Sequence, residues 1–281
     1  MSLPALGGFA QKAVRHARWR VRRAVAVTAD AMRRGDRTVI MTPPRGLRFG
    51  NWLYLWLDAH QKTAAGQPTC VLEAPGMRPW FDVFPTLQAW TIPRDELRFH
   101  DRRDWNDSDW RQVFGDDFTR ETLQSFVNSC LADDVDPGPR DRVVINVRRG
   151  DYYKNAEMRR RYGFDQVGYV SAAMELFTDV GEVLVVSDDA DWCREHLGGL
   201  LRERIRNVSF AAPDPAANFL AVAGARRIIG TNSTFTYWAA YVADAMNPDA
   251  EIVMPLFHSR LFASSSAYQL DPHWTALDGF N

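Results

Sequence analysis

The sequence has few cysteines and no long run of apolar residues. Its three cysteines, Cys70, Cys130 and Cys193, show neither a pairing pattern nor the CxxC spacing of a metal site. This argues against a disulfide-bonded secreted fold and favours a reducing cytoplasm. No apolar run approaches the roughly 20 residues that span a bilayer, and no signal-peptide hydrophobic stretch precedes a cleavage site. The sequence therefore predicts a soluble, cytoplasmic protein.

The chain as a whole lacks an excess of charge of either sign, since its 34 Lys and Arg nearly balance its 35 Asp and Glu and the formal net charge is −1. Residues 1–40 nevertheless carry nine Lys or Arg against Asp30 and Asp36. The excess is local, so no nucleic-acid partner is expected. Within it, residues 9–34 mix Val and Trp with Arg as a basic amphipathic helix would, and such a helix could rest on an anionic inner membrane surface. The alternative is a solvated terminal helix, packed on the body or frayed.

Several catalytic and cofactor signatures are missing. There is no GxGxxG, no P-loop Lys-Ser/Thr and no GxSxG, so the sequence indicates no dinucleotide site, Walker site or hydrolase-type nucleophile. The six histidines are dispersed without HxxxH spacing, which gives no indication of zinc. We therefore expect neither a required metal nor a cofactor.

The chain has 281 residues, 46% of them hydrophobic, and this length favours two domains. The first half has two strand-like runs and two segments of helical periodicity, at 37–42, 69–74, 52–64 and 116–131. The Trp- and Pro-rich region 75–115 cannot be placed. Residues 132–141 are acidic, with two prolines and a glycine, and are typical of a linker.

After this linker, short apolar strands alternate with helices. We expect strands at 142–147, 182–187, 205–210, 226–230 and 251–254, and helices at 165–178, 190–197, 214–225 and 233–246. This alternation predicts a doubly wound α/β domain with a parallel sheet, and the first half is expected to form a second one. Ligands bind such sheets beyond the carboxyl ends of the strands.

One of these strand ends carries Arg148, Arg149, Gly150 and Asp151. The planar guanidinium group binds phosphate or carboxylate through two parallel hydrogen bonds, and it stays charged near neutral pH. The pair therefore indicates an anion site, in which Asp151 could orient one arginine. The alternative is a solvated strand end with a local salt bridge.

Two further segments place polar residues or glycine between a strand and a helix. In residues 227–246, Thr231, Asn232, Ser233 and Thr234 crowd a helix start, where hydroxyl and backbone N–H groups either cap the helix or bind phosphate. In residues 45–54, Gly46 and Gly50 allow close approach of a ligand beside Asn51, and a plain turn is the alternative.

A fourth segment, VLVVSDDADWCREHL, places Ser187, Asp188 and Asp189 after a strand. Its acidic residues resemble a metal-binding DxD motif. Carboxylates in this position also cap the next helix, and we expect capping or support of neighbouring groups rather than metal binding.

Together the four segments resemble the α-1,2-fucosyltransferase family and its relatives among the α-1,6- and protein O-fucosyltransferases. NVRRGDY at 146–152 is similar to the family's His-Val/Ile-Arg-Arg-Gly-Asp-Tyr string, and RFGNWLY at 48–54 is similar to its Gly-x-x-Gly-Asn-Gln loop. VSDDADW at 186–192 and IIGTNSTFTYWAAYV at 228–242 are similar to its FSDD…W and Asn-Ser-Ser/Thr-Phe segments.

The resemblance implies a GT-B-like fold, in which two Rossmann-like domains face each other across a cleft. A basic N-terminal helix at 1–35 would precede an acceptor-side domain at 36–138 and a nucleotide-sugar domain at 139–281. The implied activity is an inverting, metal-independent transfer of fucose from GDP-fucose to a glycan hydroxyl, most simply in α-1,2 linkage. The implied donor-binding residues are Gly50, Asn51, Asn146, Arg148, Arg149, Ser187, Asp188, Asn218, Ser233, Thr234 and Phe235.

Catalysis would then depend on Arg148, Asp151 and Glu157. Fixed arginines and helix-end donors would stabilise the negative charge that grows on the leaving diphosphate. The base that takes the acceptor's proton would be Asp151, near the anion site, or Glu157, at the place where the α-1,6 relatives carry a proposed base. Glu157 could instead be a solvated partner of Arg160 or Arg161.

The chain departs from the family's pattern at two positions, with Asn146 in place of His and Asn218 in place of Asp. An asparagine meets one of guanine's two donors with its own NH₂, a mismatch that costs roughly 1 to 3 kcal/mol when buried. Asp214, one helical turn earlier, could substitute. Two alternatives follow: a transferase that uses another nucleotide-sugar, or a catalytically silent module that binds a nucleotide or a glycan.

Overall fold

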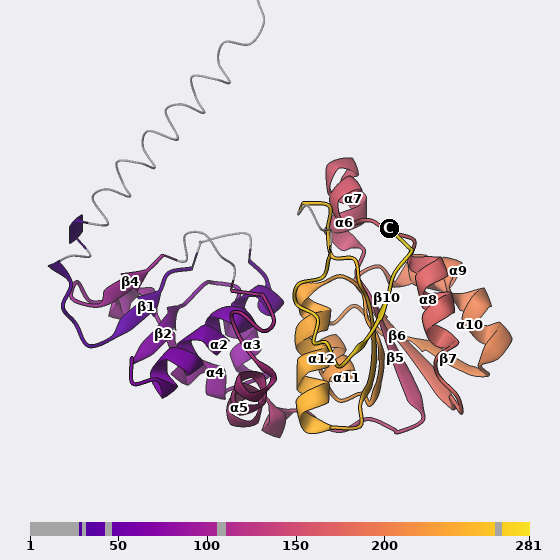
Figure 1. The fold of residues 1–281 in the computed structure, drawn as a ribbon, viewed down its shortest axis with the longest axis horizontal. Coiled ribbons are helices and arrows are strands. Elements are labelled where there is room, and N and C mark those ends of the chain that lie inside the picture. The colour runs from indigo at the N-terminus through magenta and orange to yellow at the C-terminus, as the bar shows by residue number, and fades with distance from the viewer. Residues whose placement is uncertain (1–27, 30–31, 43–46, 106–110, 262–265) are drawn as a thin grey trace, which may run out of the picture.

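The computed structural model describes residues 28–29, 32–42, 47–105, 111–261 and 266–281, which form two α/β units side by side (Figure 1). The strands described in each unit run parallel. This confirms the predicted α/β class with two Rossmann-like sheets. The helix expected at 1–35 falls almost wholly outside these residues, and the boundary between 138 and 139 stays a prediction.

Among the described residues, the N-terminal unit has a four-stranded sheet in the order β3-β2-β1-β4. Its strands are β1 (Thr38–Ile40), β2 (Thr69–Leu72), β3 (Thr91–Ile92) and β4 (Arg102–Asp104). Its helices are α2 (Phe49–Ala64), α3 (Arg78–Phe81), α4 (Thr86–Ala89) and α5 (Arg120–Cys130), with 3₁₀ turns at Arg94–Glu96 and Ala132–Asp134. The elements β1, β2, α2 and α5 lie where the periodicity predicts, and the other four organise the unplaced region 75–115.

The described part of the C-terminal sheet has six strands in the order β10-β9-β8-β5-β6-β7. They are β5 (Arg142–Val147), β6 (Glu182–Ser187), β7 (Asn207–Phe210), β8 (Arg227–Ile229), β9 (Glu251–Pro255) and β10 (Thr275–Leu277). This is the strand order of a dinucleotide-binding Rossmann sheet. The order reverses between β5 and β8, and the carboxyl ends of these two strands are where such a sheet binds its ligand.

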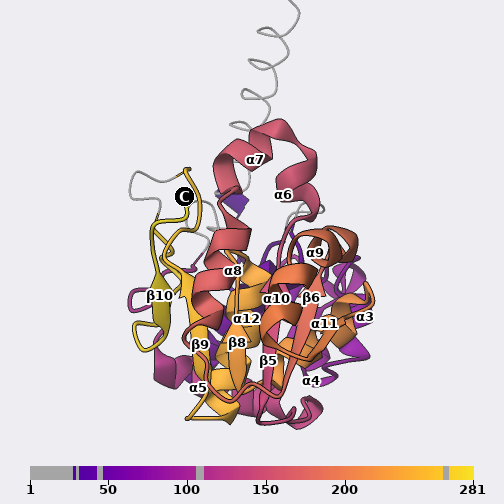
Figure 2. The ribbon, with the colours of Figure 1, turned by 90° about the vertical axis from the view of Figure 1, so that its right-hand side faces the viewer.

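Helices cover both faces of the C-terminal sheet (Figures 1 and 2). Because side chains alternate along a strand, β5 buries Val143 and Ile145 with the helices on one face and Val144 with those on the other. The outer face carries α8 (Gln166–Met174), α9 (Ala190–His196) and α10 (Gly198–Arg204), and the inner face carries α11 (Pro215–Ala223) and α12 (Thr234–Met246). Two short helices, α6 (Gly150–Lys154) and α7 (Ala156–Tyr162), follow β5.

The two units share one hydrophobic core, because α2 and α5 pack directly against α12. The buried indole ring of Trp238 on α12 makes edge contacts with Tyr54 of α2 at 5.0 Å and with Phe126 of α5 at 5.7 Å between ring centroids. Phe49 at the start of α2 makes a similar contact with Phe219 of α11 at 4.9 Å. The aromatic contacts therefore fix how the two sheets face each other.

An ion-pair triad reinforces this contact. Arg120 at the start of α5 pairs with Asp244 of α12 at 2.8 Å and with Asp271 of the C-terminal segment at 2.6 Å. Both carboxylates are almost fully buried. Burial raises the pKa of Asp244, and the Arg120 charge opposes that rise. Arg120 thus neutralises two carboxylates that would be costly to bury alone.

Replacing Arg120 by methionine should destabilise the protein. The substitution leaves Asp244 and Asp271 buried without their cation, and we expect a loss of about 3 kcal/mol because Arg120 itself is partly exposed. Urea unfolding at neutral pH measures this difference. Arg140→Met, on an exposed linker residue, is the matched control and should change stability by less than about 0.5 kcal/mol. Equal stability of the two variants would contradict the role of the triad.

Candidate functional site

The predicted motifs of the C-terminal unit meet where the strand order reverses. Arg148 follows β5 and Thr231 follows β8, and the backbone N–H of Arg148 donates to the Thr231 hydroxyl at 2.9 Å. The expected anion site and the expected phosphate-binding helix start are therefore neighbours in space. Their position at the switch point is the one at which Rossmann sheets bind ligands.

Arg148 is the more accessible of the two arginines, with 29% of its side chain exposed. Its guanidinium group pairs with Asp151 at 2.6 Å and with Asp188 at 2.8 Å. Burial lowers the pKa of Arg148, but Asp188 and Asp151 raise it by more, so the pKa lies above its ordinary value. Arg148 is therefore a fixed cation that lies between two carboxylates.

Arg149 lies in a different environment, with only 12% of its side chain exposed. Its guanidinium group lies 3.5 Å from the ring centre of Trp192 and 3.9 Å from that of Tyr153. It also donates to the amide oxygen of Gln166 at 3.1 Å, and Gln166 in turn donates to the Arg148 carbonyl at 2.8 Å. These contacts brace the loop against α8 and α9, and the donor-binding role of Arg149 stays a prediction.

Asp188 holds the loop in place. One of its oxygens accepts the backbone N–H groups of Arg149 and Gly150, at 2.8 and 3.0 Å, while the other pairs with Arg148. A Cβ at Gly150 would lie 2.2 Å from this carboxylate, so the position needs glycine. Sequence reasoning grouped Asp188 with the donor-binding residues, and its contacts are made to the arginine loop.

The neighbouring residues cap α9, as expected. Asp189 is the N-cap residue and accepts from the Trp192 N–H, and the Ser187 hydroxyl accepts from the Asp189 N–H at 3.0 Å. Within the residues that the structure describes, no group of three His, Cys, Asp or Glu is arranged to hold a metal ion. Asp189 therefore caps α9, which is one of the roles expected for this segment, and the expected lack of a metal stays a prediction.

The first residues of α12 contact the N-terminal unit. Ser233 caps the helix by accepting from the Phe235 N–H at 3.3 Å, and Phe235 packs edge-on against Phe219 at 5.3 Å. Gly50 of α2 lies so close that a Cβ there would be 2.5 Å from the Thr234 backbone. The close approach at Gly50 is thus made by the positive end of α12, where an anion would also be stabilised.

Asn51, which is half-buried, joins a chain of amides with the buried Gln112 and Gln269 that sequence reasoning missed. Its side-chain oxygen accepts from Gln112 at 3.1 Å, and Gln112 accepts from Gln269 at 3.3 Å. The chain links α2, the segment before α5 and the C-terminal segment. No local sequence signal marks it, because its members are more than 60 positions apart, as Asn51 and Gln112 are.

The two asparagines that depart from the family pattern are both buried, but only the Asn146 side chain has hydrogen-bond partners among the described residues. Asn146 donates to the Val186 carbonyl at 3.4 Å and accepts from the Thr236 hydroxyl, so its amide links β6 to α12. The side-chain amide of Asn218, on α11, makes no hydrogen bond to another described residue. Asp214 caps α11 through the N–H groups of Ala216 and Ala217.

The structure brings one of the two candidate bases to Arg148. Asp151 pairs with it directly. Glu157 is exposed on α7 and pairs with Arg161 one turn further along the same helix. The alternative interpretation of Glu157 as a partner of Arg161 is therefore confirmed, and no ion pair or hydrogen bond joins it to Arg148 or Asp151 among the described residues.

A buried histidine, His258, lies near Arg148, to which it is connected through the rings of Tyr162 and Tyr152. The imidazole of His258 is surrounded by the rings of Tyr162, Tyr237 and Tyr268, and its Nδ1 lies 3.5 Å from the Tyr237 hydroxyl. Burial lowers its pKa to about 4. The Asn232 amide donates to the backbone carbonyls of Tyr162 and His258, at 2.8 and 2.7 Å, and so ties α7 to the end of β8.

Comparison with known proteins shows the family to which the chain belongs. A glycosyl transferase family model matches residues 88–276, which is most of the chain. The chain therefore belongs to glycosyl transferase family 11, and the resemblance to α-1,2-fucosyltransferases is confirmed.

Its curated relatives include galactoside alpha-(1,2)-fucosyltransferase 1 of Lagothrix lagotricha and of Aotus azarae. Each is 25% identical over 248 residues, covering 84% of this chain and 59% of the relative. The chain thus spans a little over half the length of these relatives. Among solved structures, it is similar to E. coli heptosyltransferase WaaC with ADP (TM-score 0.39, 10% identity, 86% of this chain and 90% of that one). It is also similar to POFUT1 in complex with GDP (TM-score 0.33, 13% identity, 78% and 74%).

Replacing Gly50 by alanine should destabilise the protein by more than about 1 kcal/mol, because the new Cβ would meet the Thr234 backbone at 2.5 Å. Gly199→Ala is a matched control on α10, where a Cβ meets nothing within 4 Å. The control should be neutral or slightly stabilising. Thermal unfolding of both variants measures the difference. If Gly50→Ala is as stable as the control, the close approach of α2 to α12 is not a constraint.

The buried His258 should make stability depend on pH. The unfolded state protonates near pH 6.5 and the folded state only near 4, so stability is full above about pH 6.5 and falls as the pH drops to 4. The loss is of order 3 kcal/mol at the lower limit. His258→Gln should remove this part of the pH dependence, as measured by urea unfolding at pH 4.5 and 7. His196→Gln, at an exposed histidine, should leave the dependence unchanged.

Proposed function

We propose that this protein is an inverting, metal-independent glycosyltransferase that moves fucose from GDP-fucose to a glycan hydroxyl, in α-1,2 linkage. The observation that carries the proposal is the position of Arg148, a partly exposed fixed cation next to the start of α12 at the sheet's switch point. Membership of family 11 and the names of the curated relatives support the transferred sugar.

The anion site explains how the bond to the leaving group could break without a metal. As the acceptor oxygen attacks the anomeric carbon, the bond to the diphosphate breaks and its electron pair moves to the diphosphate oxygen. Arg148 and the α12 N-terminus are already in place to stabilise that charge. A single displacement of this kind inverts the anomeric configuration.

The free protein also suggests how the base is prepared. Asp188 is tied to the loop backbone, whereas Asp151 is 60% exposed and holds Arg148 by its side chain alone. A diphosphate that binds Arg148 would therefore displace Asp151 more readily than Asp188. The released Asp151 carboxylate would then be available, close to the reacting centre, to take the acceptor's proton.

Asn218 is the group we assign to the donor base. The residue is 7% exposed, and its side-chain amide is not fully enclosed and makes no hydrogen bond to another described residue, so a bound base would supply the missing partners. Asp214 is less suited to this role, because one of its carboxylate oxygens already caps α11.

We further propose a cytoplasmic enzyme whose basic N-terminal segment contacts the inner membrane surface. The nine Lys or Arg in residues 1–40 support this contact. No helix in the described part of the chain combines the length and apolarity needed to cross a membrane.

A second candidate function is a silent module that binds nucleotide or glycan without transfer. The pairing of Arg148 with both Asp151 and Asp188 favours it, because the cation is satisfied without a ligand. Incubation with GDP-fucose and a panel of galactosides, with products detected by mass spectrometry, separates the two. GDP binding without any fucosylated product would establish the module and overturn the transferase.

Arg148→Ala should reduce transfer by about 10²–10³-fold, because it removes one charge-stabilising donor from the site. The fold should persist, since Asp151 and Asp188 are both partly exposed and can be solvated. Arg160→Ala, on the exposed face of α7, is the matched control and should keep full activity. Initial rates with GDP-fucose measure both variants. An Arg148→Ala enzyme as active as the control would rule out the diphosphate assignment.

A further inference from the structure

Helix α6 places one tyrosine against each of the two arginines at the end of β5. Tyr152 follows Arg148 by four residues, and Tyr153 follows Arg149 by the same spacing. The guanidinium carbon of Arg148 lies 5.5 Å from the centre of the Tyr152 ring, and that of Arg149 lies 3.9 Å from the centre of the Tyr153 ring. Both contacts attract the cation through the electron-rich face of the ring. Each arginine of the loop therefore has an aromatic partner on α6.

The two tyrosines differ in what their hydroxyl groups do. The Tyr153 hydroxyl donates to the Phe164 carbonyl and accepts from the Phe164 N–H, both at 3.1 Å, so it anchors α6 to the chain that follows α7. The Tyr152 hydroxyl makes no hydrogen bond to another described residue. The contact between Tyr152 and Arg148 thus depends on the ring and not on the hydroxyl.

The Tyr152 ring is held from outside the arginine loop. It stacks on the ring of Tyr162, the last residue of α7, with centroids 4.3 Å apart and planes at 14°. The Tyr162 ring contacts His258 edge-on at 6.2 Å, and the Tyr162 carbonyl accepts from Asn232 at 2.8 Å. His258 follows β9 and Asn232 follows β8, so other loops of the sheet fix the stack. The ring can therefore keep its place when a partner of Arg148 changes.

Tyr152 differs from the other partners of Arg148 because it carries no charge at neutral pH. Burial raises the pKa of its phenol, and the Arg148 charge opposes that rise without cancelling it. The carboxylates of Asp151 and Asp188 attract the guanidinium group but repel an approaching diphosphate. An uncharged ring attracts the cation without this repulsion. Tyr152 can thus restrain Arg148 both before and after a diphosphate has replaced Asp151.

We propose that Tyr152 is a positioning residue that keeps the Arg148 guanidinium group directed at the diphosphate of the donor, an assignment that rests on the proposed transferase function. Without the ring, an Arg148 side chain that has exchanged Asp151 for the ligand would hold it through Asp188 alone. The long side chain would then regain rotamer freedom, and this freedom would have to be lost again on binding. Tyr162 contributes indirectly, by fixing the ring of Tyr152.

The test is a double-mutant cycle on GDP binding, measured by titration calorimetry on the whole chain. Tyr152→Leu should weaken GDP binding about fivefold, because it removes the ring and keeps an apolar side chain. Tyr152→Phe should stay within about twofold of the unaltered protein, because it keeps the ring. When Arg148→Ala is already present, Tyr152→Leu should cause no further loss, since the ring acts through Arg148.

The matched control is Phe99→Leu in the N-terminal unit. It removes a ring that lies 6.0 Å from the guanidinium group of Arg33, a comparable contact that belongs to none of the predicted motifs. GDP affinity should not change. A thermal melt of each Tyr152 variant within about 2 °C of the unaltered protein ensures that lost binding does not report lost folding. If Tyr152→Leu is unstable, Tyr152→Met takes its place, because a thioether packs well against the Tyr162 ring.

The outcomes separate this proposal from the proposed function. Unchanged GDP affinity in Tyr152→Leu, or an equal loss with and without Arg148, overturns the positioning role even if fucose is transferred. A loss that Tyr152→Phe avoids and that requires Arg148 supports the positioning role, and it does so even in a protein that transfers no fucose, which would overturn only the transferase. If the unaltered protein binds no GDP, both proposals are wrong.

Discussion

Helix α12 is the constraint on which the rest of the structure depends, because both units pack against it and the candidate anion site begins at its first turn. Its Trp238 ring holds α2 and α5, and its Asp244 is paired with Arg120. Its Thr234 backbone receives Gly50, and its Thr236 hydroxyl binds Asn146 of β5. One helix thus sets both the distance between the sheets and the position of the strand end that carries the arginines.

The two adjacent arginines look alike in sequence but lie in different environments at the carboxyl end of β5. Arg149 is enclosed by Trp192 and Tyr153 and braces the loop, whereas Arg148 turns toward Asp151 and Asp188 and stays accessible. Asp188 makes this division possible, since one of its carboxylate oxygens accepts the backbone N–H groups of the consecutive residues Arg149 and Gly150. A support that is built from backbone contacts leaves the Arg148 side chain free to change its partner.

The sequence alone predicts the regular elements well where the physical signal is local. The apolar runs of β5, β6 and β8 and the periodicity of α2 and α12 identify the two parallel sheets and their order along the chain. The sequence does not predict the elements of region 75–115, because β3 and β4 have only two and three residues. Pairing with β2 and β1, rather than their own composition, holds these strands in place. The motifs bring the residues of the candidate anion site together, but they cannot show that Asn51 binds Gln112 or that Glu157 binds Arg161.

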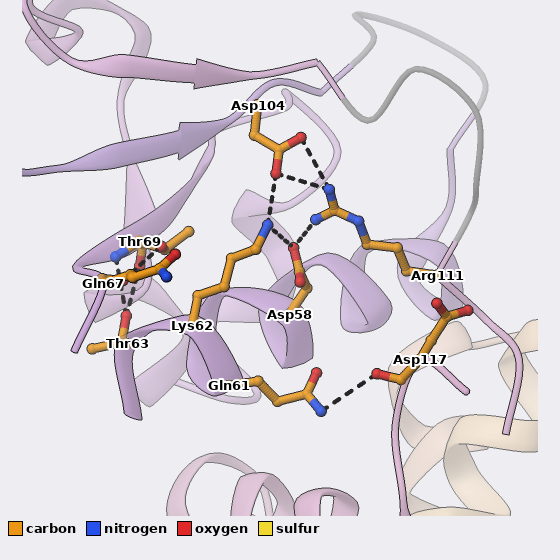
Figure 3. A network of polar contacts seen from close by, with 9 residues as sticks. All are labelled: Asp58, Gln61, Lys62, Thr63, Gln67, Thr69, Asp104, Arg111 and Asp117. Carbon is orange, nitrogen blue, oxygen red and sulfur yellow. Dashed lines mark hydrogen bonds and ion pairs between the residues drawn. The ribbon is translucent and has the colours of Figure 1, made fainter. Parts of the chain in front are cut away.

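Long-range pairing also explains why the ion-pair network of Asp58, Lys62, Asp104 and Arg111 beside α2 has no sequence signal (Figure 3). Asp58, Lys62, Asp104 and Arg111 look like ordinary surface charges when they are read in order, and only the fold brings them into one network. This network and the candidate anion site both pair an arginine with two carboxylates, but they differ in how easily a carboxylate can be displaced. At Arg148, one of the two carboxylates, Asp151, is 60% exposed and is held by its side chain alone, so in the proposed function a diphosphate would replace it. At Arg111, both carboxylates also bind Lys62, so displacing either one costs a second ion pair. Arg148 is therefore a cation whose carboxylate partner can be exchanged, whereas Arg111 belongs to a closed network that resists such an exchange.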